Sequence, residues 1–231
     1  MITRFGLLTK RNGVSAEAFN EHWQRVHGPM AARFPGLRGY WQHAVVDKEQ
    51  FGISHARGAG WDLDGFSELH FDDLQAMLDA VSGDIFAPTL ADETEFLEDV
   101  RLVACEKHEV VPVNLGEGPY IKRMTLLKRL PGISPEEFRH EWLVNHANFV
   151  RQWPNVLGYR QNLVVDRYHG SRTESASYEA VPVDGIVEFW FRSKEEAAEL
   201  YASDIVARTQ EHAKVFLDTI TPYFVETRKI V

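Results

Sequence analysis

The chain has 231 residues, with 34 acidic and 25 basic side chains and a formal net charge of −9. No cluster of Lys or Arg interleaved with aromatic residues offsets this acidity, so no nucleic-acid partner is expected. No apolar run approaches the roughly 20 residues that span a bilayer, so no membrane partner is expected either. The single cysteine, Cys105, excludes an internal disulfide and favours a reducing compartment. Because residues 1–5 read into a strand and not into a signal peptide, we expect a cytoplasmic protein.

The sequence contains an internal repeat. Residues 13–47 align without a gap on residues 132–166, at an offset of 119, and 13 of the 35 aligned positions are identical. Ordinary residue frequencies would give roughly two identities. The match resumes at an offset of 120, where Asp64-Gly65 returns as Asp184-Gly185. A period this long indicates one duplicated domain and not an array of short repeats.

The elements of the first half are predicted from apolar periodicity and turn residues. Residues 5–10 form a short apolar segment typical of a strand, and Gly13-Val14-Ser15 then supplies a turn and a helix N-cap. The helix should end before Pro35. Its apolar face is expected to carry Phe19, Trp23, Val26 and Met30.

The rest of the first half predicts a second strand at 39–46, a third at 66–71 and a fourth at 100–110. Helical patterns cover 72–81 and 86–97. The second half repeats this order, with strands at 123–128 and 158–165 and a helix that begins at Pro135. We therefore expect domains at 1–113 and 120–231, joined by a glycine-containing linker at 114–119.

The order β-α-β-β-α-β is the ferredoxin-like arrangement. A sheet covered by helices on one face must bury its other face. We therefore predict an α+β fold in which the two repeats pack sheet to sheet, as a pseudo-dimeric α+β barrel within one chain. An interior of about eight strands is just wide enough to hold a small ligand.

His27 and His146 are the first candidate catalytic residues, because each follows a repeated tryptophan, Trp23 or Trp142, by four residues. A histidine whose pKa lies near the working pH can act as a general base. The alternative is a core or capping histidine that a backbone carbonyl satisfies. Duplication copies structural and catalytic residues alike, so recurrence does not decide between these roles.

Tyr40 and Tyr159 follow the histidines by 13 residues and are the second candidates. A tyrosine hydroxyl can orient a substrate or stabilise an oxyanion, although a sheet aromatic is the alternative. Further candidates for contacts with substrate are the two tryptophans and several polar or aromatic residues of later strands and loops: Trp23, His43, His55, His70, Trp142, Asn162 and Trp190. His169 is a loop histidine like His55.

No metal site is expected, since the histidines are not spaced as ligands on one helix face and no metal motif is present. A phosphate-binding glycine loop is also absent. No cofactor is therefore expected, with haem left open, because a single axial histidine needs no local motif.

The stretch Gly13–Phe19, with Trp23, His27-Gly28-Pro29 and Gly39-Tyr40, resembles the EthD family. The second half, with Asp184-Gly185-Ile186 and Thr221–Phe224, resembles the methylmuconolactone methylisomerase branch of that group. This resemblance implies a dimeric α+β barrel, here fused in tandem. It implies small aromatic-derived acids, lactones or polyketides as substrates, with the helix histidine and the strand-two tyrosine in the active site. Half two departs from the family's His-x-Pro, because it reads His146-Ala147-Asn148.

Three functions follow as hypotheses. The first is a cofactor-free isomerase, lyase or cyclase that transfers protons on a small acid, lactone or polyketide. The second is an oxidoreductase, with haem or as a cofactor-free oxygenase. The third is a ligand-binding accessory protein without catalysis. A small-molecule substrate is the partner expected for the enzymes, and a homodimer of the fused chain is left open.

Overall fold

The structure is a computed structural model that describes the whole chain, residues 1–231. Its eight strands are β1 (Ile2–Lys10), β2 (Gly39–Asp47), β3 (Gly65–Phe71), β4 (Leu97–Val111), β5 (Ile121–Arg129), β6 (Gly158–Tyr168), β7 (Gly185–Phe191) and β8 (Leu217–Lys229). They close into one barrel in the order β1-β3-β2-β8-β5-β7-β6-β4, and every neighbouring pair is antiparallel. The predicted α+β barrel closed within a single chain is confirmed.

Two seams join the halves of this barrel. Strand β2 pairs with β8, placing His43 opposite Thr227, and β4 pairs with β6, placing Cys105 opposite Val164. Within the first half the strands follow the order β4-β1-β3-β2, and the second half repeats it as β8-β5-β7-β6. Each half therefore contributes one four-stranded section of the wall.

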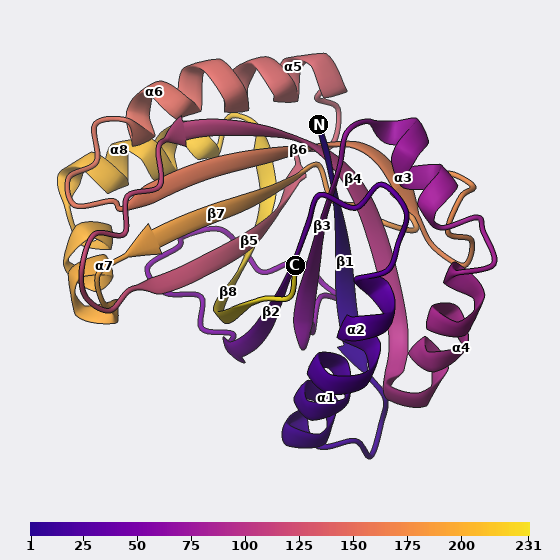
Figure 1. Cartoon of the computed structure of the whole chain (residues 1–231). Coiled ribbons are helices and arrows are strands. Elements are labelled where there is room, and N and C mark those ends of the chain that lie inside the picture. Colours follow the sequence, from indigo (N-terminus) through magenta and orange to yellow (C-terminus); the bar gives the residue numbers. More distant parts are fainter.

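The helices lie on the outside of the barrel, in two separate groups (Figure 1). The first half contributes α1 (Ala16–His22), η1 (Trp23–His27), α2 (Gly28–Ala31), α3 (Leu74–Ala80) and α4 (Phe86–Phe96). The second half contributes α5 (Pro135–His140), η2 (Glu141–His146), α6 (Ala147–Val150), α7 (Lys194–Tyr201) and α8 (Asp204–Ala213). None of these helices is both long enough and apolar enough to cross a lipid bilayer.

The first helix of each half begins as predicted and then departs from α-helical geometry. The Ser15 side chain accepts a hydrogen bond from the backbone of Ala18, and Ser134 forms a capping box with Glu137. Both helices then widen into a π-helical segment, η1 or η2. Each segment contains the repeated tryptophan and ends at the repeated histidine, His27 or His146. Val26, which was predicted on the buried face, is 44% exposed. The wider turn rotates that face, and such segments often occur at functional sites.

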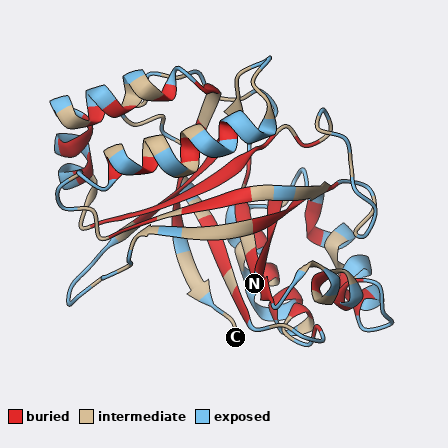
Figure 2. Ribbon diagram, turned by 90° about the horizontal axis from the view of Figure 1, so that it is seen from above, coloured by how far each residue is buried: buried red, intermediate tan, exposed pale blue.

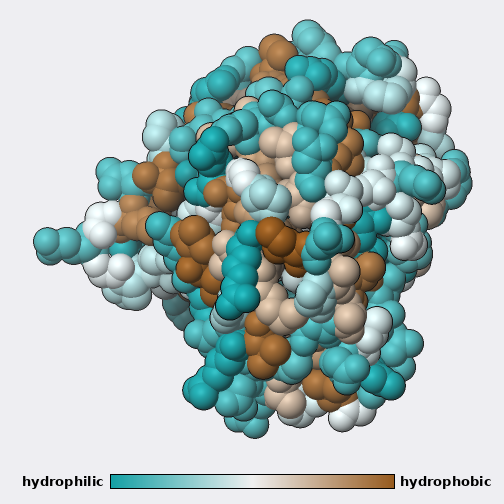
Figure 3. All heavy atoms as spheres, turned by 45° about the vertical axis from the view of Figure 1, so that its right-hand side comes forward, coloured by the Kyte–Doolittle hydropathy of each residue, from teal (hydrophilic) through white to brown (hydrophobic).

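Three apolar cores follow from the alternation of side chains along the strands. Two of them lie between the outer face of the barrel and the helices of each half, and the third fills the barrel interior. In Figure 2 most strand residues are accordingly buried. Along β2, Tyr40 and Ala44 face the helices, whereas Val45 belongs to the interior core. On the molecular surface, apolar residues form separate small groups among hydrophilic ones (Figure 3).

The long loop of each half crosses to the other half. The first-half loop, residues 48–64, forms a bridge between Ala56 and Thr219 and exchanges two hydrogen bonds with the Gln210 side chain. The second-half loop, residues 169–184, contacts the first half through His169–Asp99 and Arg172–Glu93. Each long loop thus makes polar contacts with the opposite repeat.

Candidate functional site

Two pockets lie at equivalent places in the repeats, each between the outer face of the sheet and the helices. The first-half pocket is lined by Trp23, His27 and Tyr40, and the second-half pocket by Trp142, His146 and Tyr159. The structure therefore brings together each predicted histidine, tyrosine and tryptophan. It places them outside the barrel and not in its interior, because alternation along β2 and β6 points both tyrosines toward the helices. The expected ligand site in the barrel interior is therefore wrong for these residues, since the interior is filled by an apolar core and by other polar side chains.

The tyrosine of each pocket is held by the same device. The Gln161 amide donates to the Tyr159 hydroxyl at 3.0 Å and to the Trp142 carbonyl at 2.8 Å, and Gln42 repeats this with Tyr40 and Trp23. The carbonyl of the π-helical segment is thereby tied to the strand. Burial raises the pKa of the Tyr159 hydroxyl well above its ordinary value, against the hydrogen bond from Gln161. The group therefore remains a phenol that can donate its hydrogen.

The histidine of the second-half pocket lies at the end of a polar chain. His212 approaches Glu141 at 3.1 Å from Nε2 to the carboxylate, and its Nδ1 lies 3.4 Å from Nδ1 of His146. Burial, followed by the neighbouring His212 and His55, lowers the pKa of His146 to about 3. The expected pKa near the working pH is therefore wrong, and His146 is neutral at neutral pH.

Aromatic rings form much of the wall of the second-half pocket. Phe189 stacks on Tyr159 at 4.4 Å and on Trp153 at 5.3 Å between ring centroids. The cavity itself is small, about 60 Å³, and it opens partly to solvent. Ile53, from the crossing first-half loop, completes the lining. The chemistry of this pocket thus depends on both repeats.

His55 lies on the same crossing loop, and its charge acts on His146 across the halves. Both of its ring nitrogens are shielded from solvent and have no hydrogen-bond partner in the protein. Burial and nearby Lys214 lower the pKa of His55. His169, in the second-half loop, instead pairs with Asp99 at the surface.

In the first-half pocket, the histidine is paired directly with a carboxylate of its own repeat. His27 and His22 bind the two oxygens of Asp92, at 3.0 and 2.8 Å. Burial lowers the pKa of His27, while Glu93 and Asp92 oppose that shift. At the repeat offset of 120, Asp92 corresponds to His212 and Glu93 to Ala213, so the carboxylates of this pocket have no counterpart at those two positions in the second.

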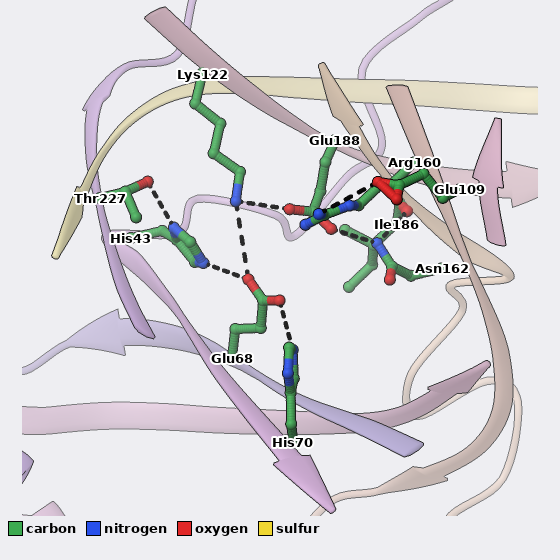
Figure 4. Close-up of polar contacts among 10 residues, drawn as sticks. All are labelled: His43, Glu68, His70, Glu109, Lys122, Arg160, Asn162, Ile186, Glu188 and Thr227. Carbon is green, nitrogen blue, oxygen red and sulfur yellow. Dashed lines mark hydrogen bonds and ion pairs between the residues drawn. The ribbon is translucent and has the colours of Figure 1, made fainter. Parts of the chain in front are cut away.

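Four other predicted residues lie on the inner side of the barrel wall. His43, His70 and Asn162 belong to a buried polar group that we call the barrel cluster: His43, Glu68, His70, Lys122, Asn162 and Glu188 (Figure 4). Lys122 lies 2.6 Å from Glu188 and 3.8 Å from Glu68, and its ammonium group lies 4.8 Å from the ring centroid of Trp190. His43, His70, Asn162 and Trp190 are therefore separated from both pockets by the sheet.

The barrel cluster is compact and internally paired. Glu68 receives hydrogen bonds from His43 and His70, both at 2.7 Å, and Asn162 donates to Glu188 at 2.9 Å. Burial would raise the pKa of the Glu68 carboxyl, but Lys122 and the two histidines hold it well below its ordinary value. Burial lowers the pKa of His43. Since Glu68 and Glu188 come from different halves, Lys122 joins the two repeats at the centre of the molecule.

Sequence reasoning assigned no role to Glu141, His212 or Lys122. Their partners are far away along the chain, the nearest being Glu68, which pairs with Lys122. Glu68 and Glu188 did recur in the repeat alignment, and that recurrence was the available signal. No group of three or more His, Cys, Asp or Glu side chains is placed to hold a metal ion.

The chain is an α+β barrel protein with one pocket between the sheet and the helices of each half. The EthD domain profile matches residues 11–99 and 130–220, so the chain belongs to the EthD family and carries the domain twice. A comparison with curated proteins found no match.

Solved structures share the fold. An anthrone oxidase-like protein is 14% identical, with a TM-score of 0.64, covering 99% of this chain and 93% of its own. A dye-decolorizing peroxidase from Bacteroides thetaiotaomicron is 8% identical, with a TM-score of 0.53, covering 97% of this chain and 92% of its own. Identities this low establish the barrel architecture alone.

Proposed function

We propose that the second-half pocket is the active site of a cofactor-free oxidase that removes a proton from an acidic carbon of a flat aromatic substrate. The carbanion formed in this way then reacts with dioxygen. The observation that carries the proposal is the chain from Glu141 through His212 to His146, which ends at an aromatic-walled pocket. The second half would be catalytic and the first half structural.

The chain fixes where each proton lies. Glu141 is an acceptor, so Nε2 of His212 carries hydrogen and Nδ1 of His212 is left as an acceptor. Nδ1 of His146 then donates to it, which leaves the Nε2 lone pair of His146 free. A histidine oriented by a second group and backed by a carboxylate has the arrangement of a general base. The low pKa of His146 in the empty pocket rises when an anion forms beside the ring, because opposite charge favours the imidazolium.

The aromatic wall fits a flat substrate. Tyr159, Phe189 and Trp153 stack on one another along the wall, and a stacked or tilted contact between one of these rings and a further ring is worth about 0.5–1.5 kcal/mol beyond the area buried. The Tyr159 hydroxyl can donate to an oxygen on which charge develops. Extended conjugation in the substrate would also make its carbon acid strong enough for an imidazole.

The reaction balances with dioxygen as the only co-substrate. Nε2 of His146 takes a proton from a ring CH₂, and the carbanion transfers one electron to O₂. The two radicals combine into a C–O bond, and the resulting peroxide anion takes the proton back from the His146 imidazolium. Nε2 of His146 then removes the remaining C–H proton, the C=O bond forms as the O–O bond breaks, and the released hydroxide takes that proton and leaves as water. The protein supplies the base, the hydrogen-bond donor and a pocket with few water-accessible polar groups.

Haem was tested against the same pocket. His146 could supply one axial nitrogen, but the stack of Tyr159, Phe189 and Trp153 would have to separate to admit a macrocycle. The residues in this arrangement do not fit that group, and no step is derived through it.

Isomerisation is the second candidate, and the pairing of His146 with the Tyr159 hydroxyl in one pocket favours it. Here the same carbanion is protonated again at another carbon instead of reacting with dioxygen. We also propose that each half, 1–113 and 120–231, is a ferredoxin-like unit, and that a small molecule is the main partner of the protein.

The test is oxygen uptake with anthrone, chosen because the anthrone oxidase-like protein shares this fold. We expect enzyme-dependent consumption of one O₂ per anthraquinone formed, in the presence of a chelator and without visible haem absorption. The rate should fall to the uncatalysed level under nitrogen. No enzyme-dependent uptake with anthrone or related carbon acids would overturn the oxidase, and proton exchange without uptake would favour the isomerase.

A further inference from the structure

A buried arginine lines the second-half pocket without an acidic partner. Arg123 lies on β5 with 3% of its surface exposed, and it forms no ion pair with any carboxylate. One guanidinium nitrogen donates to the Tyr201 hydroxyl, whereas Nε and Nη1 have no hydrogen-bond partner. The guanidinium lies over the ring of Tyr201 at 4.5 Å and near Phe189 at 5.4 Å.

Such a group is costly in the empty protein. A buried cation that lacks a counterion loses several kcal/mol of hydration, which aromatic faces recover only in part. Arginine stays charged at any physiological pH, so it cannot relieve this cost by losing its proton. A negatively charged ligand that entered the pocket would supply the missing partner.

The equivalent arginine of the first repeat is also buried, but its pocket contains an acidic side chain, Glu93. Arg4 occupies the equivalent site on β1, at the repeat offset of 119. It lies beside the carboxylate of Glu93, which pairs with Arg172 at 2.6 Å, and Arg4 also reaches the Arg172 carbonyl. Burial and the neighbouring Arg172 lower the pKa of Arg4 to about 10, and Glu93 opposes this shift. The second repeat has Ala213 where the first has Glu93. A carboxylate is therefore present in the pocket of Arg4 and absent at the equivalent position in the pocket of Arg123.

We propose that Arg123 is an anion receptor and that the ligand of the second-half pocket is an aromatic anion, a carboxylate or a phenolate. The Arg123 guanidinium would bind the anionic group while the rings of Tyr159 and Phe189 hold the aromatic body. This inference deepens the proposed function, since it names the charge that the substrate carries beside its acidic carbon. Ala213 is then a specificity-determining residue, because its small side chain leaves space for the ligand and brings no carboxylate that would compete with the ligand for Arg123.

The probe is 2-naphthoate, compared with neutral 2-naphthamide, and binding is followed by quenching of tryptophan fluorescence and by calorimetry. We expect naphthoate to bind the wild type at least about tenfold more tightly than naphthamide, because a charge-assisted hydrogen bond is worth about 1.5–3 kcal/mol. Arg123→Met should remove this preference. Arg4→Met is the matched control in the other repeat and should keep it.

A second pair of variants protects the test against misfolding of Arg123→Met. Ala213→Glu restores the carboxylate of the first repeat and should lower naphthoate affinity at least about tenfold relative to Ala213→Gln, which has the same size and no charge. Equal affinity of these two variants, or equal binding of naphthoate and naphthamide by the wild type, would overturn the receptor.

Failure of the receptor and failure of the oxidase are distinguishable. His146→Gln should abolish turnover while naphthoate binding persists, because the base does not hold the anion. Naphthoate binding without turnover of any carbon acid would leave the receptor standing and reject the oxidase. Anthrone turnover with no preference for naphthoate would do the reverse.

Discussion

The two pockets share a backbone design and differ in where their charges are compensated. In the first, His27 is bound to Asp92, and Arg4 lies beside Glu93. In the second, His146 ends a chain that runs through His212 to Glu141, and Arg123 has no counterion. A duplicated fold can thus keep the walls of its two pockets while the charged side chains around them change. We assign the proposed chemistry to the second pocket, whose histidine is not paired directly with a carboxylate and whose arginine has no counterion.

The largest expected effect tests this asymmetry on turnover. His146→Gln should lower kcat with a carbon-acid substrate by about 10²–10⁴-fold, the usual contribution of a general base. His27→Gln should leave kcat within about threefold, since that ring already serves Asp92. The measurement is steady-state oxygen uptake by each single variant and by the double variant. Equal losses from the two single variants would mean that the pockets work alike, and full turnover by the double variant would reject histidine catalysis.

The second largest effect concerns the barrel cluster, which lies between the two halves. Lys122→Met leaves Glu68 and Glu188 facing each other without their common cation, and it should cost about 3 kcal/mol of unfolding free energy. Urea denaturation measures it. Lys128→Met is the matched control, because its partner Asp218 is partly exposed and such a pair contributes at most about 1 kcal/mol. Because the sheet separates the barrel cluster from the second-half pocket, Lys122→Met that is still folded should bind naphthoate as tightly as the wild type does.

The barrel could be anticipated from the sequence more completely than the site could. The repeat at an offset of 119 and the period of the strands are local signals, and β2 was expected at 39–46 and found at 39–47. The pairing of Tyr40 with His27 was also within reach, because both belong to one short repeated block. Their location outside the barrel was not anticipated, because a one-residue shift along a strand exchanges its two faces.

The unforeseen residues were those whose role depends on tertiary partners. His212 matters through Glu141 and His146, which come from another helix. Arg123 matters through the absence of a partner, and an absence leaves no pattern in a sequence. The missing partner of Arg123 is recognised only from the structure: Glu93 lines the pocket that contains Arg4, and the equivalent residue in the pocket of Arg123 is Ala213.

The smallest effect is a difference in pH dependence between the pockets. Free histidine has a pKa of 6.5, and burial lowers that of His146 to about 3, so the unfolded state binds the proton first as the pH falls. Stability contributed by the neutral ring is therefore present above 6.5 and is lost between 6.5 and 3. From pH 7.5 to 5.5 this should cost about 1 kcal/mol.

His146→Gln should flatten that slope more than His27→Gln does, because Asp92 and Glu93 oppose the lowering of the His27 pKa. Urea titrations of the three proteins at both pH values measure the difference. An unchanged slope in His146→Gln would show that its ring is not held neutral by the fold.

The crossing loops carry a consequence for the ancestry of the chain. Because Ile53 of the crossing loop 48–64 lines the second-half pocket, the second repeat does not form that pocket alone, whereas every residue that lines the first-half pocket belongs to the first repeat. In a dimer of two identical single repeats, the loop of each copy would line the cavity of the other, and any change to one cavity would alter both. Joining the copies in a single polypeptide removes that symmetry, so one cavity can keep a lining residue from the other repeat while its counterpart does not.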